Sequence, residues 1–122
     1  LLYQDYLTMD VEKIKSNYTE NTLFYNVMNS GIDEFKTLDE EFAQFDQYME
    51  MFELVGLRES GFPDLLDYDG EGAVVISWVE MTFKNRKSGN TATILQHIQH
   101  SFNDEGEIVR EDYYFNPAQL PQ

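Results

Sequence analysis

The sequence predicts an α+β domain in which helices come first and a curved antiparallel sheet follows and wraps a single pocket. Hydrophobic residues recur every three or four positions before Gly56 and every second position after Phe62, which is a change from helical to strand periodicity. The 122 residues, 42% of them hydrophobic, suffice for one packed core. We therefore expect one domain over residues 1–122.

The first part of the chain is predicted to alternate between short helices and one strand. Residues 2–7 show the apolar stripe of a helix end, so we expect the first helix to be truncated at Leu1. Asp10 can cap a short second helix. Residues 22–27 are rich in β-forming side chains and predict a strand, which a turn at 29–31 ends.

The clearest predicted helix begins at Thr37. Thr37 and Glu40 fit a capping box, in which each side chain satisfies a free backbone N–H group. We expect Gly56 to end this helix. Its apolar stripe comprises Leu38, Phe42, Phe45, Met49 and Phe52. Its opposite face, predicted to be solvated, carries Asp39, Glu41, Asp46 and Glu50.

Strands are predicted near residues 62–68, 73–84, 91–103 and 108–115, separated by short turns. Turns this short favour an antiparallel meander. Alternation aims one set of side chains from each strand at the pocket. With residues from the first strand, the predicted pocket set is Tyr25, Asn26, Ser77, Val79, Met81, Gln96, Ile98, Tyr113 and Phe115.

Two ionisable side chains belong to the inward sets. His100 lies on the more apolar face of its strand, and Glu111 shares a face with Tyr113 and Phe115. A carboxylate and an imidazole on neighbouring strands could form an acid–base pair suited to proton abstraction beside a carbonyl. The alternative is a hydrogen-bonded core network that only fixes the strands.

The strand at 73–84 is predicted to be covered on both faces for half its length. Its outward set begins with Val74, Ile76 and Trp78 before it turns polar. Because the helices can bury only one face of the sheet, we expect these three residues to form the interface of a homodimer.

Composition excludes several classes of partner. The formal net charge of −15 disfavours nucleic acid and anionic lipid, and no apolar run is long enough to cross a bilayer. We therefore expect a small-molecule ligand and neither nucleic acid nor membrane as a partner. Without cysteine there is no thiolate chemistry, and the compartment stays undecided. His97 and His100 are predicted to point to opposite faces of one strand, so we expect no metal site and no cofactor.

Three stretches together resemble the nuclear transport factor two-like superfamily, near its SnoaL-like and ketosteroid isomerase-like members. They are DVEKI followed by YTENTLFYN (residues 10–26), WVEMTF (78–83), and FNDEGEI followed by DYYFN (102–116). The resemblance implies a cone-shaped half-barrel, commonly dimeric, with a hydrophobic pocket between sheet and helices. Members include isomerases, cyclases, epoxide hydrolases, dehydratases and plain binding domains, so the fold alone names no reaction.

The family's catalytic residues are not retained. Ketosteroid isomerases would place their general-base Asp at Asn26, their protonated Asp at Ile98 and their oxyanion Tyr near Leu2. Epoxide hydrolases of this fold would share Asn26 but would require an Arg at Trp78 and an Asp at Tyr113.

The leading hypothesis is therefore a pocket that binds a small, largely apolar molecule and catalyses proton transfer through Glu111 and His100, as an isomerase, cyclase or dehydratase would. The second is a non-catalytic, dimeric ligand- or partner-binding module. A third is a water-adding hydrolase that uses Asn26.

Overall fold

The computed structural model describes residues 2–26, 34–61, 63–68 and 72–122. The helices are α1 (Leu2–Thr8), α2 (Val11–Lys15) and α4 (Leu38–Met51), with a 3-10 turn η1 (Pro117–Gln119) near the end. The strands are β1 (Tyr18–Asn26), β2 (Phe52–Glu59), β3 (Asp64–Tyr68), β4 (Gly72–Asn85), β5 (Thr91–Phe102) and β6 (Ile108–Tyr114). The predicted turn at 29–31 and the predicted strand start at Phe62 lie outside the described residues.

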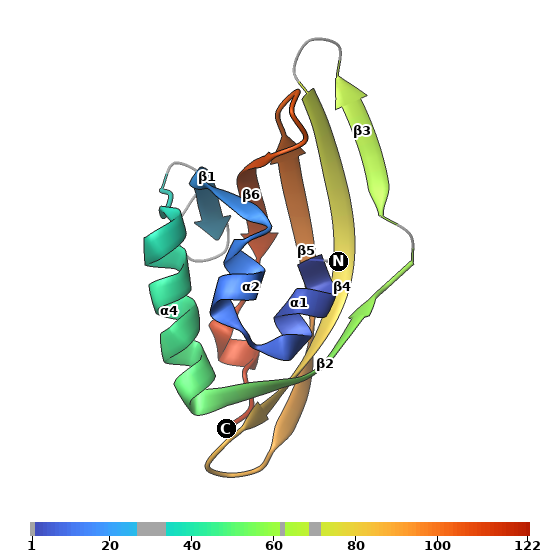
Figure 1. Cartoon of the computed structure of the whole chain (residues 1–122). Helices are drawn as coiled ribbons and strands as arrows, with labels where there is room; N and C mark the ends of the chain where they lie inside the picture. Colours follow the sequence, from blue (N-terminus) through green and yellow to red (C-terminus); the bar gives the residue numbers. More distant parts are fainter. Residues whose placement is uncertain (1, 27–33, 62, 69–71) are drawn as a thin grey trace.

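One curved sheet wraps around the helices (Figure 1). Its strands are ordered β1-β6-β5-β4-β2, with β3 also paired to β4. The predicted antiparallel meander of β4, β5 and β6 is confirmed. The sheet as a whole is mixed, because β1 pairs with β6 in parallel. Those two strands are far apart in sequence, so no hairpin fixes their relative direction.

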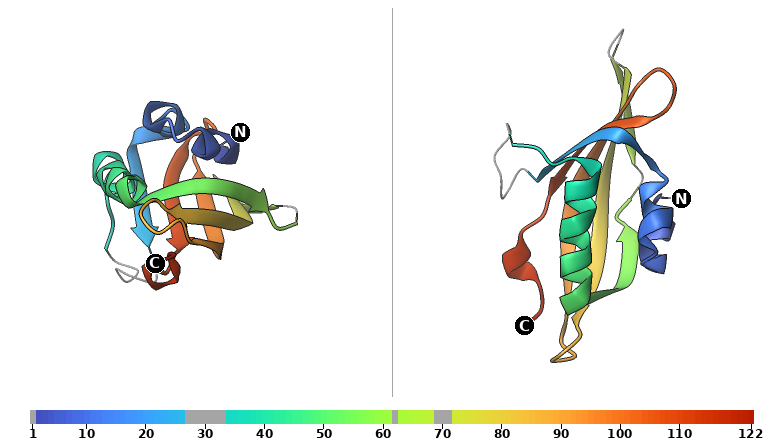
Figure 2. Two further views of the ribbon diagram at one scale, coloured as in Figure 1. Left: turned by 90° about the horizontal axis from the view of Figure 1, so that it is seen from below. Right: turned by 60° about the vertical axis from the view of Figure 1, so that its left-hand side comes forward.

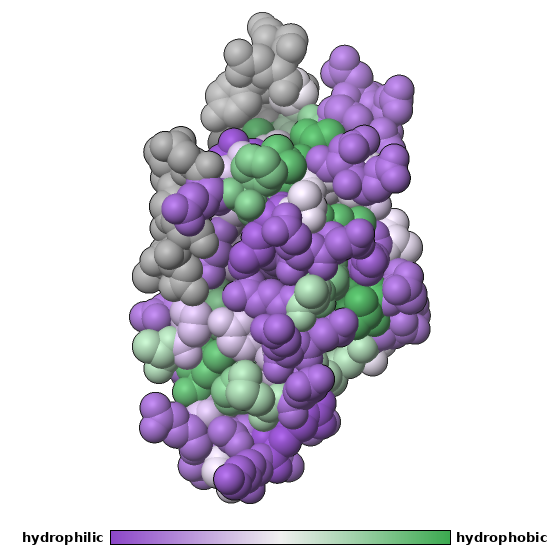
Figure 3. All heavy atoms as spheres, turned by 90° about the vertical axis from the view of Figure 1, so that its left-hand side faces the viewer, coloured by the Kyte–Doolittle hydropathy of each residue, from purple (hydrophilic) through white to green (hydrophobic). Residues whose placement is uncertain are grey.

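The helices lie on the concave side of this sheet (Figure 2). Helix α4 contacts β1, β2 and α2, and α1 contacts β2. The buried core fills the space between the two layers, with Ile14, Phe24 and Val79 at 1% exposure or less. The surface on the α4 side is mostly hydrophilic (Figure 3), as expected for a helix that buries only one stripe. No helix in the described ranges is long and apolar enough to cross a membrane.

The start of α4 is predicted correctly, but its end is not. Thr37 accepts from the Glu40 N–H group while the Glu40 carboxylate accepts from the Thr37 N–H group, which completes the capping box. The helix ends at Met51 rather than at Gly56. Residues 52–59 instead form β2, which pairs antiparallel with β4. Gly56 lies at a register shift in that pairing, where a β-bulge bends the strand.

Alternation assigns the sheet faces correctly along β4 and β5. Ser77, Val79, Met81 and Phe83 are buried on β4, and Ile94, Gln96, Ile98 and His100 are buried on β5. The prediction fails only at the start of β6, where Ile108 is buried and Val109 is exposed. The pairing of β5 with β6 shifts register between the pairs Ser101–Arg110 and Phe102–Ile108, which breaks the two-residue rhythm there, and the rhythm resumes before Glu111.

Candidate functional site

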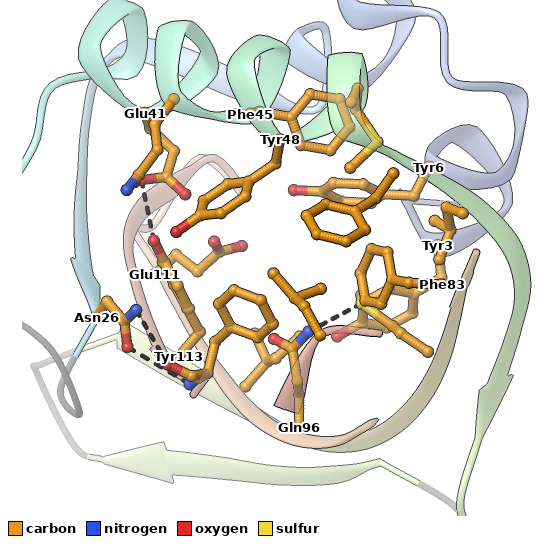
Figure 4. Close-up of a pocket in the computed structure, with 18 residues that line it drawn as sticks. Tyr3, Tyr6, Asn26, Glu41, Phe45, Tyr48, Phe83, Gln96, Glu111 and Tyr113 are labelled. Atoms are coloured by element: carbon orange, nitrogen blue, oxygen red, sulfur yellow. Dashed lines mark hydrogen bonds between the residues drawn. The ribbon is translucent and has the colours of Figure 1, made fainter. Parts of the chain in front are cut away.

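A cavity of about 100 Å³ lies between the concave face of the sheet and helices α1 and α4. This is several times the space that one water molecule needs. Its wall is mainly aromatic and aliphatic, with a few polar side chains that point inward (Figure 4). A concave, mainly apolar space with convergent polar groups is the usual form of a small-molecule site.

The polar centre of the cavity is Glu111, on β6. Its side chain is 8% exposed, and its Oε1 atom lies 2.7 Å from both the Tyr18 hydroxyl and Nε2 of His100. The pairing register places His100 directly opposite Glu111, so the strands themselves hold the pair together. Among the described residues, Oε2 takes part in neither of these bonds, and the carboxylate points into the cavity (Figure 4).

A chain of tyrosine hydroxyl groups extends from this carboxylate toward α1. The Tyr18 hydroxyl donates to Glu111 and lies 3.2 Å from the Tyr6 hydroxyl. Burial raises the pKa of Tyr6 and of Tyr18 well above the ordinary value, and the charge of Glu111 adds to both shifts. These hydroxyl groups therefore stay protonated and serve as hydrogen-bond donors at any physiological pH.

A second carboxylate, Glu41 of α4, faces the same cavity. It accepts a hydrogen bond of 3.1 Å from the Tyr113 hydroxyl, and Lys36 Nζ lies 3.8 Å away. Burial, followed by repulsion from Glu111, raises the pKa of Glu41 to about 7. The Glu41 side chain can therefore exchange a proton near neutral pH, which is the property required of a general acid or base.

Tyr3, on α1, also lines the cavity. Burial raises the pKa of Tyr3 to about 12, and the neighbouring Ser77 hydroxyl opposes that rise. Gln96 on β5 donates its amide N–H to the sulfur of Met81 at 2.9 Å. The contact with Met81 orients the Gln96 amide without adding charge to the wall.

The structure places most of the predicted pocket residues at the cavity wall. The predicted residues that line it are Asn26, Met81, Gln96, Ile98, Tyr113 and Phe115, together with Glu111. His100 is not among the described lining residues, and its ring bonds to Glu111, which is one of them. Ser77 and Val79 are buried below the wall. Asn26 bridges to the backbone of Phe115 with both its amide oxygen and its amide nitrogen.

Tyr25 lies on the other face of the sheet. It precedes Asn26 on β1, so alternation turns its ring away when Asn26 points inward. The ring is 8% exposed, packs 6.0 Å from Phe35, and lies 3.9 Å below the guanidinium carbon of Arg110. Its burial therefore comes from Phe35 and Arg110 and not from the cavity.

The sequence reasoning missed the helical half of the wall. Glu41 was predicted to be solvated, and this is wrong, because its side chain is only 16% exposed. The signal was present in the spacing of Glu41, Phe45 and Tyr48, which recur at intervals of four and three along α4 and all line the cavity. On α1, Tyr3 and Tyr6 were read only as apolar positions, although their hydroxyl groups make them donors.

The predicted interface residues lie on the outer face of the sheet. Trp78 is 47% exposed, and Val74 and Ile76 are half-buried. The Trp78 ring packs 4.3 Å from the ring of His97, which points outward while His100 points inward. The two histidines are therefore on opposite faces, as predicted. No group of three His, Cys, Asp or Glu side chains in the described part of the chain could hold a metal ion.

No protein-family model and no curated protein matches the sequence. Solved structures do match. A ketosteroid isomerase-like protein from Erwinia carotovora atroseptica aligns with a TM-score of 0.72 at 13% identity, over 95% of this chain and 89% of that chain. A putative SnoaL-like polyketide cyclase from Mesorhizobium loti gives 0.63 at 14% identity, over 93% and 92%.

A third neighbour was crystallised with a ligand. It is a Mycobacterium tuberculosis protein in complex with estradiol-17beta-hemisuccinate, with a TM-score of 0.65 at 10% identity, over 99% of this chain and 95% of that chain. Similarity at such low sequence identity shows a shared fold and does not show a shared reaction. The chain has the cone-shaped α+β fold of the nuclear transport factor two-like superfamily, shared with ketosteroid isomerase-like and SnoaL-like proteins.

Proposed function

We propose that the chain binds a small, largely apolar molecule in its cavity and catalyses a proton-transfer step of the isomerase, cyclase or dehydratase type. The observation that carries this proposal is the buried Glu111 carboxylate, which faces an apolar cavity while Tyr18 and His100 hold one of its oxygens. A carboxylate in such a setting is an effective base, because water does not compete for it.

In this proposal the carboxylates of Glu111 and Glu41 have different roles. Glu111 takes a proton from the bound molecule through Oε2, the oxygen that faces the cavity. His100 is a positioning residue, because it acts on the ligand only through Glu111. Glu41 faces the same cavity from α4, and its pKa of about 7 lets it return a proton to a second atom of the same molecule.

The test is proton exchange at carbon. A panel of small cyclic ketones and enones is incubated with the protein in heavy water, and deuterium incorporation is followed by NMR. Glu111→Gln should reduce exchange about 100- to 10,000-fold, the range that general-base catalysis supplies. His100→Ala should shift the pH profile of exchange, which a purely structural role would not do. The matched control is Glu105→Gln, which removes the same charge at an exposed turn.

Thermal melting of each variant separates loss of chemistry from loss of fold. Exchange that is unchanged in a folded Glu111→Gln variant would contradict the proposal. If panel compounds bind but none of them exchanges, the proposal of ligand binding stands and the proposal of catalysis is wrong.

A second candidate function, a dimeric binding module without catalysis, is favoured by the outer face. Trp78 and Leu95 are 47% and 55% exposed on adjacent strands, which is unusual for side chains so apolar. Trp78→Glu should then convert a dimer to a monomer in analytical ultracentrifugation, whereas Leu7→Glu, at an exposed position on α1, should not. A wild-type chain that sediments as a monomer would contradict this candidate.

A further inference from the structure

The cavity wall carries negative charge and no positive charge. Its described lining residues include Glu41 and Glu111 but no Lys, Arg or His. The nearest basic groups are His100, which lies behind Glu111, and Lys36, which is 3.8 Å from Glu41 and also donates to Gln44. A ligand inside the cavity can therefore contact both carboxylates directly, whereas Lys36 and His100 are not part of the described wall.

Neither carboxylate is fully compensated by its protein partners. Glu111 is 6% exposed, yet both of its hydrogen bonds end on Oε1, so Oε2 has no described partner and points into the cavity (Figure 4). Glu41 accepts from Tyr113, and its described ion-pair partner Lys36 lies 3.8 Å away and also donates to Gln44. A buried carboxylate without a close cation is costly unless a proton or another cation neutralises it.

Aromatic rings surround these carboxylates. Helices α1 and α4, strands β4 and β6 and the segment after β6 all contribute rings to the wall. These rings include Tyr6, Phe45, Tyr48, Phe83, Tyr113 and Phe115. The faces of such rings carry partial negative charge and attract cations, most strongly where water is excluded. The rest of the wall adds the rings of Tyr3 and Phe52 to aliphatic and amide side chains, and it offers no positive charge to an anion.

From this juxtaposition of two inward carboxylates with an aromatic wall, we infer that the ligand is a small organic ammonium ion with a hydrocarbon body. This inference rests on the proposed function, since it names the class of molecule that the same cavity would take. The cationic nitrogen lies between Glu41 and Glu111, and the hydrocarbon part packs against the rings. The net charge of −15 also concentrates cations and repels anions around the protein.

The experiment compares three aromatic probes that differ chiefly in charge. They are benzyltrimethylammonium, its neutral carbon isostere neopentylbenzene, and the anion benzenesulfonate. Binding is measured by NMR titration, with shifts read at cavity-lining residues such as Met81 and Ile98. The cation should bind about tenfold more tightly than the neutral isostere, since a desolvated cation–π contact and a carboxylate together supply about 1.4 kcal/mol or more. The anion should not bind.

Variants locate the source of the preference. Glu41→Gln should weaken binding of the cation until its affinity equals that of the neutral isostere, whose own affinity should not change. Glu111→Gln should likewise reduce the difference in affinity between the cation and the neutral isostere. The matched control is Glu50→Gln, which removes the same charge from an exposed position on the same helix and should change nothing. Glu41→Gln keeps the test valid even if loss of the Glu111 carboxylate disturbs the fold.

Two outcomes would overturn the inference, and they differ in what they say of the proposed function. Equal or tighter binding of the neutral isostere at the same lining residues would overturn the ligand class and leave the apolar binding site intact. Binding of no probe to the lining residues would overturn both the ligand class and the assignment of this cavity as a ligand site.

Discussion

The two faces of the β4–β5–β6 sheet come from the same strands but carry opposite kinds of side chain. The inner face buries ionisable groups, His100 and Glu111, in a hydrogen-bonded pair. The outer face leaves large apolar groups, Trp78 and Leu95, in contact with solvent. Stability alone would favour the reverse arrangement. The two proposals account for this difference by contacts with other molecules, a small ligand inside and a protein surface outside.

The largest expected effect on this comparison comes from removing the inner charge. Glu111→Ala leaves the Tyr18 hydroxyl and the His100 ring without their shared acceptor in a buried site. The free energy of unfolding should fall by about 3–5 kcal/mol, as for other buried pairs that lose one partner. Urea denaturation measures it. A loss as small as that of an exposed substitution would mean that the pair does not stabilise the inner face.

Glu41, on the inner side, should make the stability of the fold depend on pH. Its pKa is about 7 in the folded protein against an ordinary 4.5, so the folded state holds more protons between these values. The stability that this proton contributes is complete below about pH 4.5 and is lost as the pH rises through about 7. A shift of this size corresponds to about 3 kcal/mol.

As the pH rises from about 4.5 to above 7, the free energy of unfolding should fall in the wild type and fall less in Glu41→Gln. The variant lacks the carboxyl group that titrates in this range. Urea denaturation across the pH range measures both curves, and Glu50→Gln should reproduce the wild-type slope. Parallel wild-type and Glu41→Gln curves would contradict the assigned environment of Glu41.

Adjacent residues on β5 provide the finest comparison. Ile94 is 2% exposed on the inner face, and Leu95 is 55% exposed on the outer face. Ile94→Val should lower the free energy of unfolding by about 1 kcal/mol, because it removes a buried methylene group. Leu95→Val should change it by less than about 0.5 kcal/mol. Equal effects would indicate that the outer face is covered in the isolated protein.

The sequence predicts the parts of this fold that depend on local rules. The Thr37–Glu40 box locates the start of α4, and period-two alternation along β5 puts Gln96 and His100 on one face. Long-range pairing is harder to predict. Nothing local in residues 52–59 distinguishes the end of a helix from a strand, because pairing with β4 decides the matter.

The candidate site divides in the same way. The strand-borne Glu111 was found because its neighbours Tyr113 and Phe115 reveal which face it shares. The helix-borne Glu41 was missed, because a carboxylate beside an apolar stripe is usually solvated, and only the closeness of the sheet to α4 buries it.

The most direct test of the two-face account is a methyl NMR titration with benzyltrimethylammonium. The inner face is reported by the methyl groups of Met81 and Ile98, and the outer face by those of Leu95 and Val109. The account predicts saturable shifts at Met81 and Ile98, with Leu95 and Val109 unmoved. Shifts confined to Leu95 and Val109 would contradict it, because the ligand would then bind the outer sheet and the cavity would be only a gap in the core.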